Sequence, residues 1–176
     1  MSWIQTFTGK QFYPLAARVE DIDVRDIAHS LSLQSRFNGH CLRFYSVAEH
    51  SVRVSRVVPA SDALWGLLHD AAEAYIGDLP RPVKANAPEF RGIEDRLLLV
   101  VAEAFGLPWP MPEAVRLADD RLLSTEARDL MAPHPASWNL REEPLQERIE
   151  PIGWEAAEDA FLVRFEELGG RGQGAV

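Results

Sequence analysis

Cysteine, methionine and tyrosine are scarce in this chain of 176 residues, and its 18 basic residues are outnumbered by 27 acidic ones. Because Cys41 is the one cysteine, no disulfide can form within the chain, which is typical of a protein in a reducing cytoplasm. No apolar run has the length needed to cross a membrane, and the first residues lack the apolar segment of a signal peptide. We therefore expect a cytoplasmic protein that does not act on a membrane.

The excess of acidic residues gives a formal net charge of −9. This charge argues against a protein that binds nucleic-acid polymers along their backbone, because such a protein needs a basic face. It is compatible with a small phosphorylated substrate, since a metal ion and a few placed Arg or Lys residues can reverse the potential locally. The length and the absence of repeats predict one domain over residues 1–170, followed by a flexible tail at residues 171–176.

Strand signals are few, whereas helix start and stop signals recur along the chain. Residues 5–12 alternate around a Thr-Gly-Lys turn, which predicts a small N-terminal β-hairpin. A helix capped by Asp21 or Asp23 is expected to run to about Ser35, before a turn at residues 36–40. The remaining pattern predicts helices over residues 47–58, 63–76, 88–105, 112–131 and 153–168, a stiff extended loop at 78–84 and a Pro-rich loop at 133–151. The predicted fold class is all-α with one small hairpin.

The most informative motif is the sequence HDAAE at residues 69–73, inside the apolar helix predicted over residues 63–76. Ionisable side chains are rarely buried without partners, because desolvating an unpaired charge is costly. In one regular helix His69 and Glu73 would share a face, and Asp70 would lie about 100° round from His69. One divalent ion could then bind His69 and Asp70 and leave Glu73 free to take a proton. The His-Asp dipeptide alone is more typical of a packed core His beside an exposed Asp.

Two residues on other predicted helices could complete a metal site. His50 lies one turn into its helix, and Asp119 lies in an apolar context on a later one. Two His and two Asp form a mixed nitrogen and oxygen set, which favours Mn²⁺, Co²⁺, Fe²⁺, Zn²⁺ or Mg²⁺ and leaves positions open for water and substrate. Asp120 competes with Asp119 for the fourth place, and His29 and His40 compete with His50.

Three other ionisable residues have simpler explanations. His134 lies in a Pro-flanked loop and is expected to face solvent. Glu126 and Asp129 follow Asp119 on the same predicted helix, where they are expected to be solvated or paired with Arg128 or Arg121.

The order of these candidates resembles the H…HD…D signature of the HD-domain metal-dependent phosphohydrolases. The sequence EHS at residues 49–51 resembles the motif around the family's first ligand, and GDLPRPVK at residues 77–84 resembles its GDLPxPVK stretch. The resemblance covers about residues 31–131. It is strongest to bacterial 5′-deoxynucleotidases and to small phage enzymes that dephosphorylate deoxynucleoside triphosphates, and it implies an all-α HD-domain helical bundle.

The resemblance implies a divalent metal cofactor held by four residues of the chain. It favours Asp119 over Asp120, because an Ala-Asp pair is the spacing typical of the family. The implied metal ligands are His50, His69, Asp70 and Asp119.

The resemblance also implies catalytic and substrate-binding roles. Glu73 and Asp78 would position and deprotonate the attacking water, or protonate the leaving oxygen. Arg36 matches a family Arg that contacts the phosphate, and its planar guanidinium suits two-pronged binding of phosphate oxygens. Phe37 stands where the family often has a Trp near the substrate base, and Lys84 is a candidate for a further phosphate contact.

The function expected from these residues is metal-dependent hydrolysis of phosphate from deoxynucleotides. The enzyme would be a 5′-nucleotidase acting on deoxynucleoside monophosphates or a triphosphohydrolase acting on dATP or other deoxynucleoside triphosphates. Alternatives are hydrolysis of cyclic nucleotides or of (p)ppGpp, and a non-catalytic protein that senses nucleotides. The exposed apolar residues and the family pattern suggest a homo-oligomer, a dimer or larger, with Trp109 and Trp138 at a subunit interface or in a lid.

Overall fold

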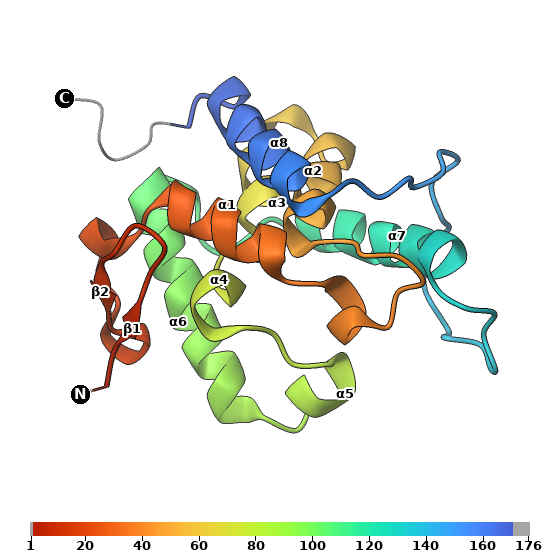
Figure 1. Cartoon of the computed structure of the whole chain (residues 1–176), viewed down its shortest axis with the longest axis horizontal. Helices are drawn as coiled ribbons and strands as arrows, with labels where there is room; N and C mark the ends of the chain where they lie inside the picture. The colour runs from red at the N-terminus through yellow and green to blue at the C-terminus, as the bar shows by residue number, and fades with distance from the viewer. Residues whose placement is uncertain (1, 171–176) are drawn as a thin grey trace.

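The computed structural model describes residues 2–170 and is built from helices apart from one hairpin (Figure 1). Strands β1 (Ile4–Gln5) and β2 (Gln11–Phe12) pair antiparallel, with Ile4 opposite Phe12. The prediction of a helical fold with a small N-terminal hairpin is confirmed, and the tail predicted at residues 171–176 lies outside the described residues. The helices are α1 (Val24–Leu33), α2 (Val47–Val57), α3 (Ala63–Leu68), α4 (Glu73–Ile76), α5 (Arg81–Lys84), α6 (Pro88–Phe105), α7 (Glu113–Leu130) and α8 (Trp154–Glu167).

Local start and stop signals account for most of these helix ends. The Asp23 carboxylate accepts the N–H of Arg25 at the start of α1, and the Ser46 hydroxyl accepts the N–H of Glu49 at the start of α2. Helix α6 begins at Pro88 and ends at Gly106, whose left-handed backbone (φ 66°) suits a residue without a side chain. Helix α1 ends two residues before the predicted limit, because Ser35 pairs with Ser46 in a β-bridge.

The single helix predicted over residues 63–76 is wrong, because a tightened turn at residues 69–72 separates α3 from α4. There the N–H of Glu73 donates to the carbonyl of Asp70 at 2.9 Å, three residues back instead of four. In such a turn, residues three apart in sequence lie on the same side. Asp70 and Glu73 therefore line one cleft together, in place of the predicted shared face of His69 and Glu73.

The extended loop predicted at residues 78–84 is half right. Residues 78–80 are non-helical, but Arg81–Lys84 form the one-turn helix α5. Pro82 fits there because the first turn of a helix leaves its N–H groups without partners, and the N–H of Lys84 donates to the carbonyl of Pro80 at 2.9 Å. This turn brings the Lys84 ammonium to 2.8 Å from the Glu94 carboxylate on α6.

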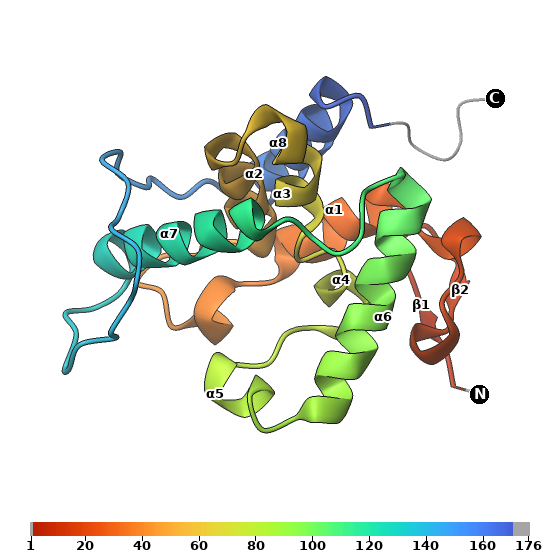
Figure 2. The same ribbon diagram turned by 180° about the vertical axis from the view of Figure 1, so that it is seen from behind.

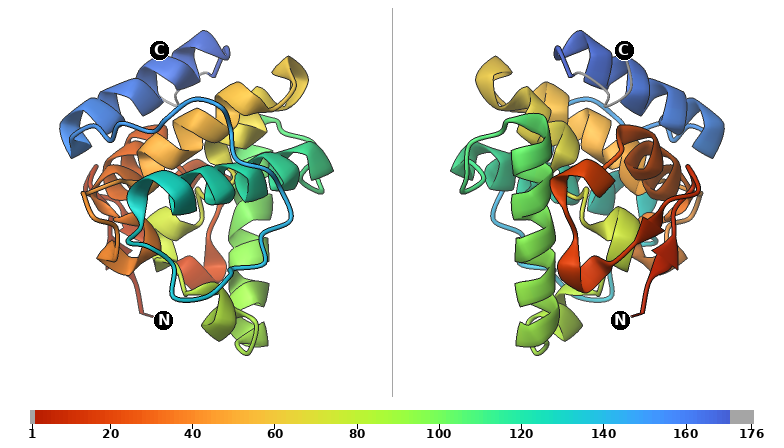
Figure 3. Two further views of the ribbon diagram at one scale, coloured as in Figure 1. Left: turned by 90° about the vertical axis from the view of Figure 1, so that its right-hand side faces the viewer. Right: turned by 90° about the vertical axis from the view of Figure 1, so that its left-hand side faces the viewer.

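Helices α2 and α3 lie at the centre, between two groups of buried apolar side chains. One group joins them to α1, α6 and α8, and the other joins them to α7. Helix α8 crosses α1 and α2, while α6 stands next to the hairpin and α7 extends to the other side (Figure 2). The long loop from α7 back to α8 swings around the outside of the molecule (Figure 3). Within residues 2–170, no helix combines the length and apolar character of a bilayer-spanning segment.

Gly66 sets how closely α3 approaches α2. A Cβ atom at this position would lie 2.9 Å from the Cα of Ser55, closer than real side chains come to a backbone. The absence of a side chain therefore lets the two backbones touch. This contact fixes the spacing between His50 on α2 and His69, which follows α3.

Candidate metal centre

The two histidines meet with the same ring nitrogen. His50 is buried on α2 and His69 is buried just past the end of α3, and their Nε2 atoms lie 3.3 Å apart. On the other side of its ring, the Nδ1 of His69 lies 2.9 Å from the carbonyl oxygen of Gly66. Because a carbonyl can only accept, this Nδ1 carries a proton, and Nε2 is the ring nitrogen left to bind a cation.

Glu126 holds the Nδ1 of His50, as the Gly66 carbonyl holds the Nδ1 of His69. Its Oε1 lies 2.5 Å from the Nδ1 of His50, and this contact between a fully buried carboxylate and a fully buried ring turns the other ring nitrogen toward His69. A carboxylate that accepts the second N–H of a histidine is the usual support for a metal-binding imidazole. The expectation that Glu126 is solvated or paired with Arg128 or Arg121 is wrong, because its other oxygen accepts a hydrogen bond from Arg36 at 3.0 Å.

Two aspartates complete the group. The Oδ1 of Asp119 lies 3.2 Å from the Nε2 of His50, and the Oδ2 of Asp70 lies 3.2 Å from the Nε2 of His69. Ligand atoms of His50, His69 and Asp119 all lie within 4.8 Å of one another. The buried Oδ2 of Asp70 has no hydrogen-bond partner among the described residues, so this oxygen is free to bind a cation next to the two rings. The three converging ligand atoms of His50, His69 and Asp119 fit a divalent cation, and the unsatisfied oxygen of Asp70 lies beside them, 3.9 Å and 3.2 Å from the two Nε2 atoms.

The electrostatics of the group favour positive charge at its centre. Burial and Arg36 lower the pKa of His50, but Glu126 and Asp119 raise it by more. The net effect is a pKa of about 9, above the usual value for histidine. Burial raises the pKa of Asp70, but the two histidines and Arg36 outweigh it and lower the pKa to about 2. Burial also raises the pKa of Asp119, but the hydrogen bond and charge of His50 outweigh it, so the pKa of Asp119 lies below its usual value. The carboxylates therefore stay ionised and hold a cation between them, either protons on the rings or a metal.

A second cluster surrounds Lys84. Its ammonium lies 2.5 Å from Asp78, 2.8 Å from Glu94 and 3.9 Å from Glu73. Burial, with the neighbouring Asp70 and Asp78, raises the pKa of Glu73 well above its usual range, so this carboxyl holds a proton more readily than an exposed one. A carboxyl of that kind is suited to general acid–base work. Lys84 is predicted to contact phosphate, and in the structure it pairs with Asp78 and Glu94 and lies near Glu73.

Arg36 links the histidine and aspartate group to a strained turn. Its guanidinium pairs with Glu126 and lies 3.9 Å from oxygens of both Asp70 and Asp119. Although burial lowers the pKa of Arg36, these three carboxylates raise it above its usual value, so the side chain stays charged. Its buried Nε has no hydrogen-bond partner among the described residues. The next residue, Phe37, has a left-handed backbone (φ 53°), an uncommon conformation that concentrates at functional sites.

These side chains line one cleft of about 690 Å³, a size typical of small-molecule sites. The cleft brings together residues from the turn after α1, the α3–α4 turn, α5, α7 and the loop after α7. Of the residues predicted for the site, Arg36, Phe37, Asp70, Glu73, Asp78, Lys84 and Asp119 line it, and His50 and His69 lie buried behind it.

The competing residues lie elsewhere or play other parts. The exposed Arg81 pairs with both Asp119 and Asp120, but Asp119 is the one of the two that also lies next to His50, 3.2 Å from its Nε2. His29 stacks on Phe7 and contacts Glu158, away from the cleft. The expectation of an exposed His134 is confirmed, and His40 lies at the rim of the cleft without contacting the two buried histidines. The sequence contained one unused signal for Glu126, because it follows Asp119 by seven residues, or two helical turns, and so shares its face.

Comparison with known proteins identifies relatives without a described activity. No protein-family model matches the chain. The chain is similar to YfdR of Escherichia coli K12, described as an uncharacterized protein, with 41% identity over 171 residues that cover 96% of each chain. It is also similar to an uncharacterized protein of Rhodobacter capsulatus, with 36% identity over 127 residues that cover 66% of this chain and 65% of the other.

Proposed function

The chain belongs to the family of Escherichia coli YfdR, and we propose that it is an HD-domain phosphohydrolase that uses a divalent metal to remove phosphate from deoxynucleotides. The observation that carries this proposal is the convergence of the Nε2 atoms of His50 and His69 with Asp70 and Asp119 at the wall of a cleft. That cleft also contains an arginine, a lysine and a carboxyl of raised pKa. Few reactions other than hydrolysis of a phosphate ester or anhydride use all of these groups together.

The proposed metal ligands are His50, His69, Asp70 and Asp119. The Gly66 carbonyl and Glu126 hold the Nδ1 atoms of the two rings, so both Nε2 atoms are available for coordination. When bound, a divalent ion supplies a water of lowered pKa and a Lewis acid for a phosphate oxygen. Co²⁺, Mn²⁺, Zn²⁺, Fe²⁺ and Mg²⁺ all suit such a donor set.

The chain's own residues supply proton transfer and phosphate binding. Glu73 is buried beside Asp70 at the cleft wall, where it can take a proton from the attacking water. Asp78, held by Lys84, can orient that water or return the proton to the leaving oxygen. Arg36 and Lys84 offer positive charge to the phosphoryl oxygens. The water oxygen bonds to phosphorus, the bond from phosphorus to the leaving oxygen breaks, and the proton taken from the water passes to that leaving oxygen. A deoxynucleoside monophosphate then gives the deoxynucleoside and free phosphate. A deoxynucleoside triphosphate gives the deoxynucleoside and triphosphate, or the diphosphate and free phosphate.

The position of Glu73 favours an enzyme over a nucleotide sensor. A sensor needs a metal and phosphate contacts but has no use for a buried carboxyl of raised pKa next to them. Hydrolysis of a cyclic nucleotide or of (p)ppGpp would use the same metal centre and would differ from the proposed reaction only in the substrate. We include cytoplasmic location and assembly into a homo-oligomer in the proposal, and light scattering on the purified protein measures the assembly.

Metal analysis and a nucleotide screen test the proposal. The purified protein is expected to contain about one divalent ion per chain. With Co²⁺ or Mn²⁺ it should release phosphate from dAMP, and phosphate or triphosphate from dATP or dGTP. Glu73→Gln should retain the metal and reduce turnover by about 10²-fold or more, because it removes the proton acceptor. The matched control is Glu103→Gln, an exposed residue of α6 outside the cleft, which should behave like the wild type. Absence of both free phosphate and triphosphate with every metal and substrate would reject the proposal.

A further inference from the structure

The two ends of the cleft differ in chemistry. The inner end is charged and contains the proposed metal ligands, Arg36 and the carboxylates around Lys84. The outer end is apolar, and its residues come from the turn after α1 and from the chain that follows α7. They are Phe37, Met131, Trp138 and Leu140. A ligand that fills the cleft must therefore join an anionic group to a flat or apolar one.

Aromatic side chains form a continuous row along the outer end. The guanidinium of Arg36 lies over the Phe37 ring, 5.5 Å from its centre. The Phe37 and Trp138 ring centres are 5.9 Å apart, and those of Trp138 and His134 are 5.1 Å apart. The row leads from the buried guanidinium next to the metal centre to the exposed His134.

Of the two rings in this row that line the cleft, Trp138 is more exposed than Phe37 and has more surface left for a ligand. Its side chain is 38% exposed, although it lies in the cleft lining and contacts other rings on two sides. A base cannot lie between Phe37 and Trp138, because two stacking contacts of about 3.5 Å each need about 7 Å between ring centres. The base would instead lie against the open surface of the indole. Tryptophan is a common platform for such stacking, because it is large, flat and tolerant of different bases.

Resting on the proposed function, we propose that Trp138 is a specificity-determining residue, whose indole stacks on the base of the nucleotide while Arg36 binds its phosphate. The strained backbone at Phe37 and Asn38 (φ 53° and 50°) supports this role, since the Phe37 ring next to it packs against Trp138. The loop after α7 thus contributes base recognition, and the helices contribute the chemistry.

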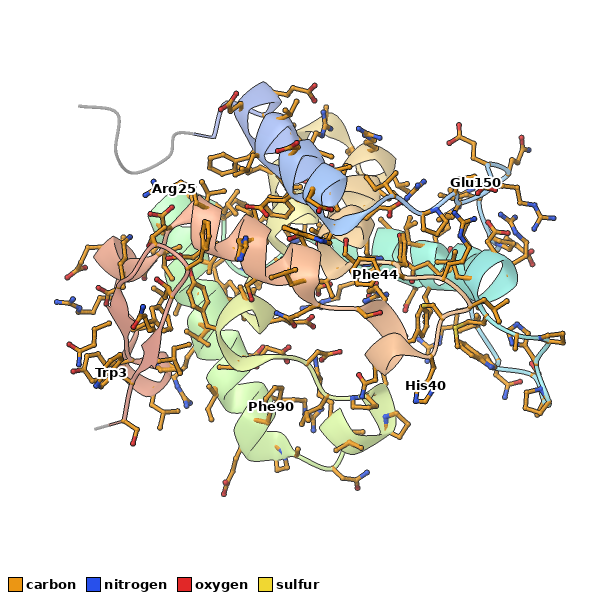
Figure 4. The ribbon with its side chains drawn as sticks, in the orientation of Figure 1. Trp3, Arg25, His40, Phe44, Phe90 and Glu150 are labelled. Carbon is orange, nitrogen blue, oxygen red and sulfur yellow. The ribbon has the colours of Figure 1, made fainter. Side chains whose placement is uncertain are left out.

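Binding of dAMP to the full chain tests this role without relying on turnover. The probe is dAMP with Mn²⁺, titrated by calorimetry into Glu73→Gln protein so that hydrolysis is suppressed. Adding Trp138→Ala should weaken the affinity for dAMP about tenfold, while Trp138→Phe should retain most of it, because it keeps an aromatic face. The matched control is Trp3→Ala, since Trp3 is 50% exposed near the hairpin, at the opposite end of the molecule from His40 at the cleft rim (Figure 4). Unchanged affinity in Trp138→Ala, or no binding of dAMP to the Glu73→Gln parent, would overturn the inference.

A second measurement separates failure of this inference from failure of the proposed function. Phosphate release from dAMP and from 2-deoxyribose 5-phosphate, which lacks a base, is compared in the otherwise wild-type chain. The ratio of the two kcat/KM values should fall about tenfold in Trp138→Ala. If neither compound is hydrolysed, the proposed function fails and the binding experiment still decides the role of Trp138. If both are hydrolysed with an unchanged ratio, or if the substitution changes only the subunit number, Trp138 does not recognise the base.

Discussion

Replacing Glu126 by Gln tests whether the buried carboxylate on α7 supports the metal centre. The carboxylate accepts hydrogen bonds from two donors, the Nδ1 of His50 at 2.5 Å and the Nη2 of Arg36 at 3.0 Å, and it is 0% exposed. Glutamine has the same shape but only one accepting oxygen. Its amide N–H₂ must therefore face one of the two donors, and one charge-assisted hydrogen bond is lost.

The magnitude follows from the burial of this contact. Losing one charge-assisted hydrogen bond costs ~1.5–3 kcal/mol, and Arg36 keeps the partial support of Asp70 and Asp119 at 3.9 Å. We expect the free energy of unfolding to fall by about 2 kcal/mol, which lowers Tm by about 4–8 °C for a domain of this size. The orientation of His50 is also weakened, so affinity for Mn²⁺ or Co²⁺ should fall about 10- to 100-fold.

Two assays on the same variant check this expectation. Thermal unfolding of metal-free protein measures the stability, and chelator competition measures the metal affinity. The control is Asp129→Asn on the same helix, which removes contacts with Arg128 and Arg148 and should leave the metal affinity unchanged. If Glu126→Gln has normal metal affinity, Glu126 does not support His50 in the way that the geometry indicates.

Two further substitutions test the packing and the pH dependence. Gly66→Ala places a Cβ 2.9 Å from the Cα of Ser55. It should lower the free energy of unfolding, measured in urea, by about 1–2 kcal/mol, because the gain in helix propensity offsets only part of the overpacking. Equal or higher stability would contradict the close contact of α2 and α3. A hydrogen bond from Arg128, with further ones from Ile149 and Arg148, holds the pKa of Asp129 well below its usual value. Its stabilisation is therefore present above the unfolded pKa of about 3.9 and is lost as the pH falls below it. Asp129→Asn should lower the free energy of unfolding by ~1–2 kcal/mol at pH 7, measured by thermal unfolding. The difference in stability between the wild type and this variant should shrink below about pH 4. A difference that does not change with pH would show that the charge of Asp129 is not responsible.

The helix ends and the residue types of the site were accessible from sequence because they depend on neighbours along the chain. Pro88 and Gly106 bound α6 as predicted, and the caps at Asp23 and Ser46 are formed. The sequence does not reveal the turn at residues 69–72, because it is compatible with a regular helix. It does not reveal the Arg81–Lys84 turn either, because proline is as common in the first turn of a helix as in extended chain.

The sequence by itself determined where most helices begin and end, and which side chains could bind a metal, because capping, helical periodicity and side-chain chemistry are local properties. Tertiary structure decided which atoms converge. His50 and His69 are 19 residues apart and His50 and Glu126 are 76 apart, and the contact of α2 with α3 at Gly66 sets the spacing of the two rings. Glu126 looks like an ordinary solvated residue in sequence, and only the packing of α7 against α2 buries it against His50. In the same way, only the path of the loop after α7 places Trp138 at the outer end of the cleft.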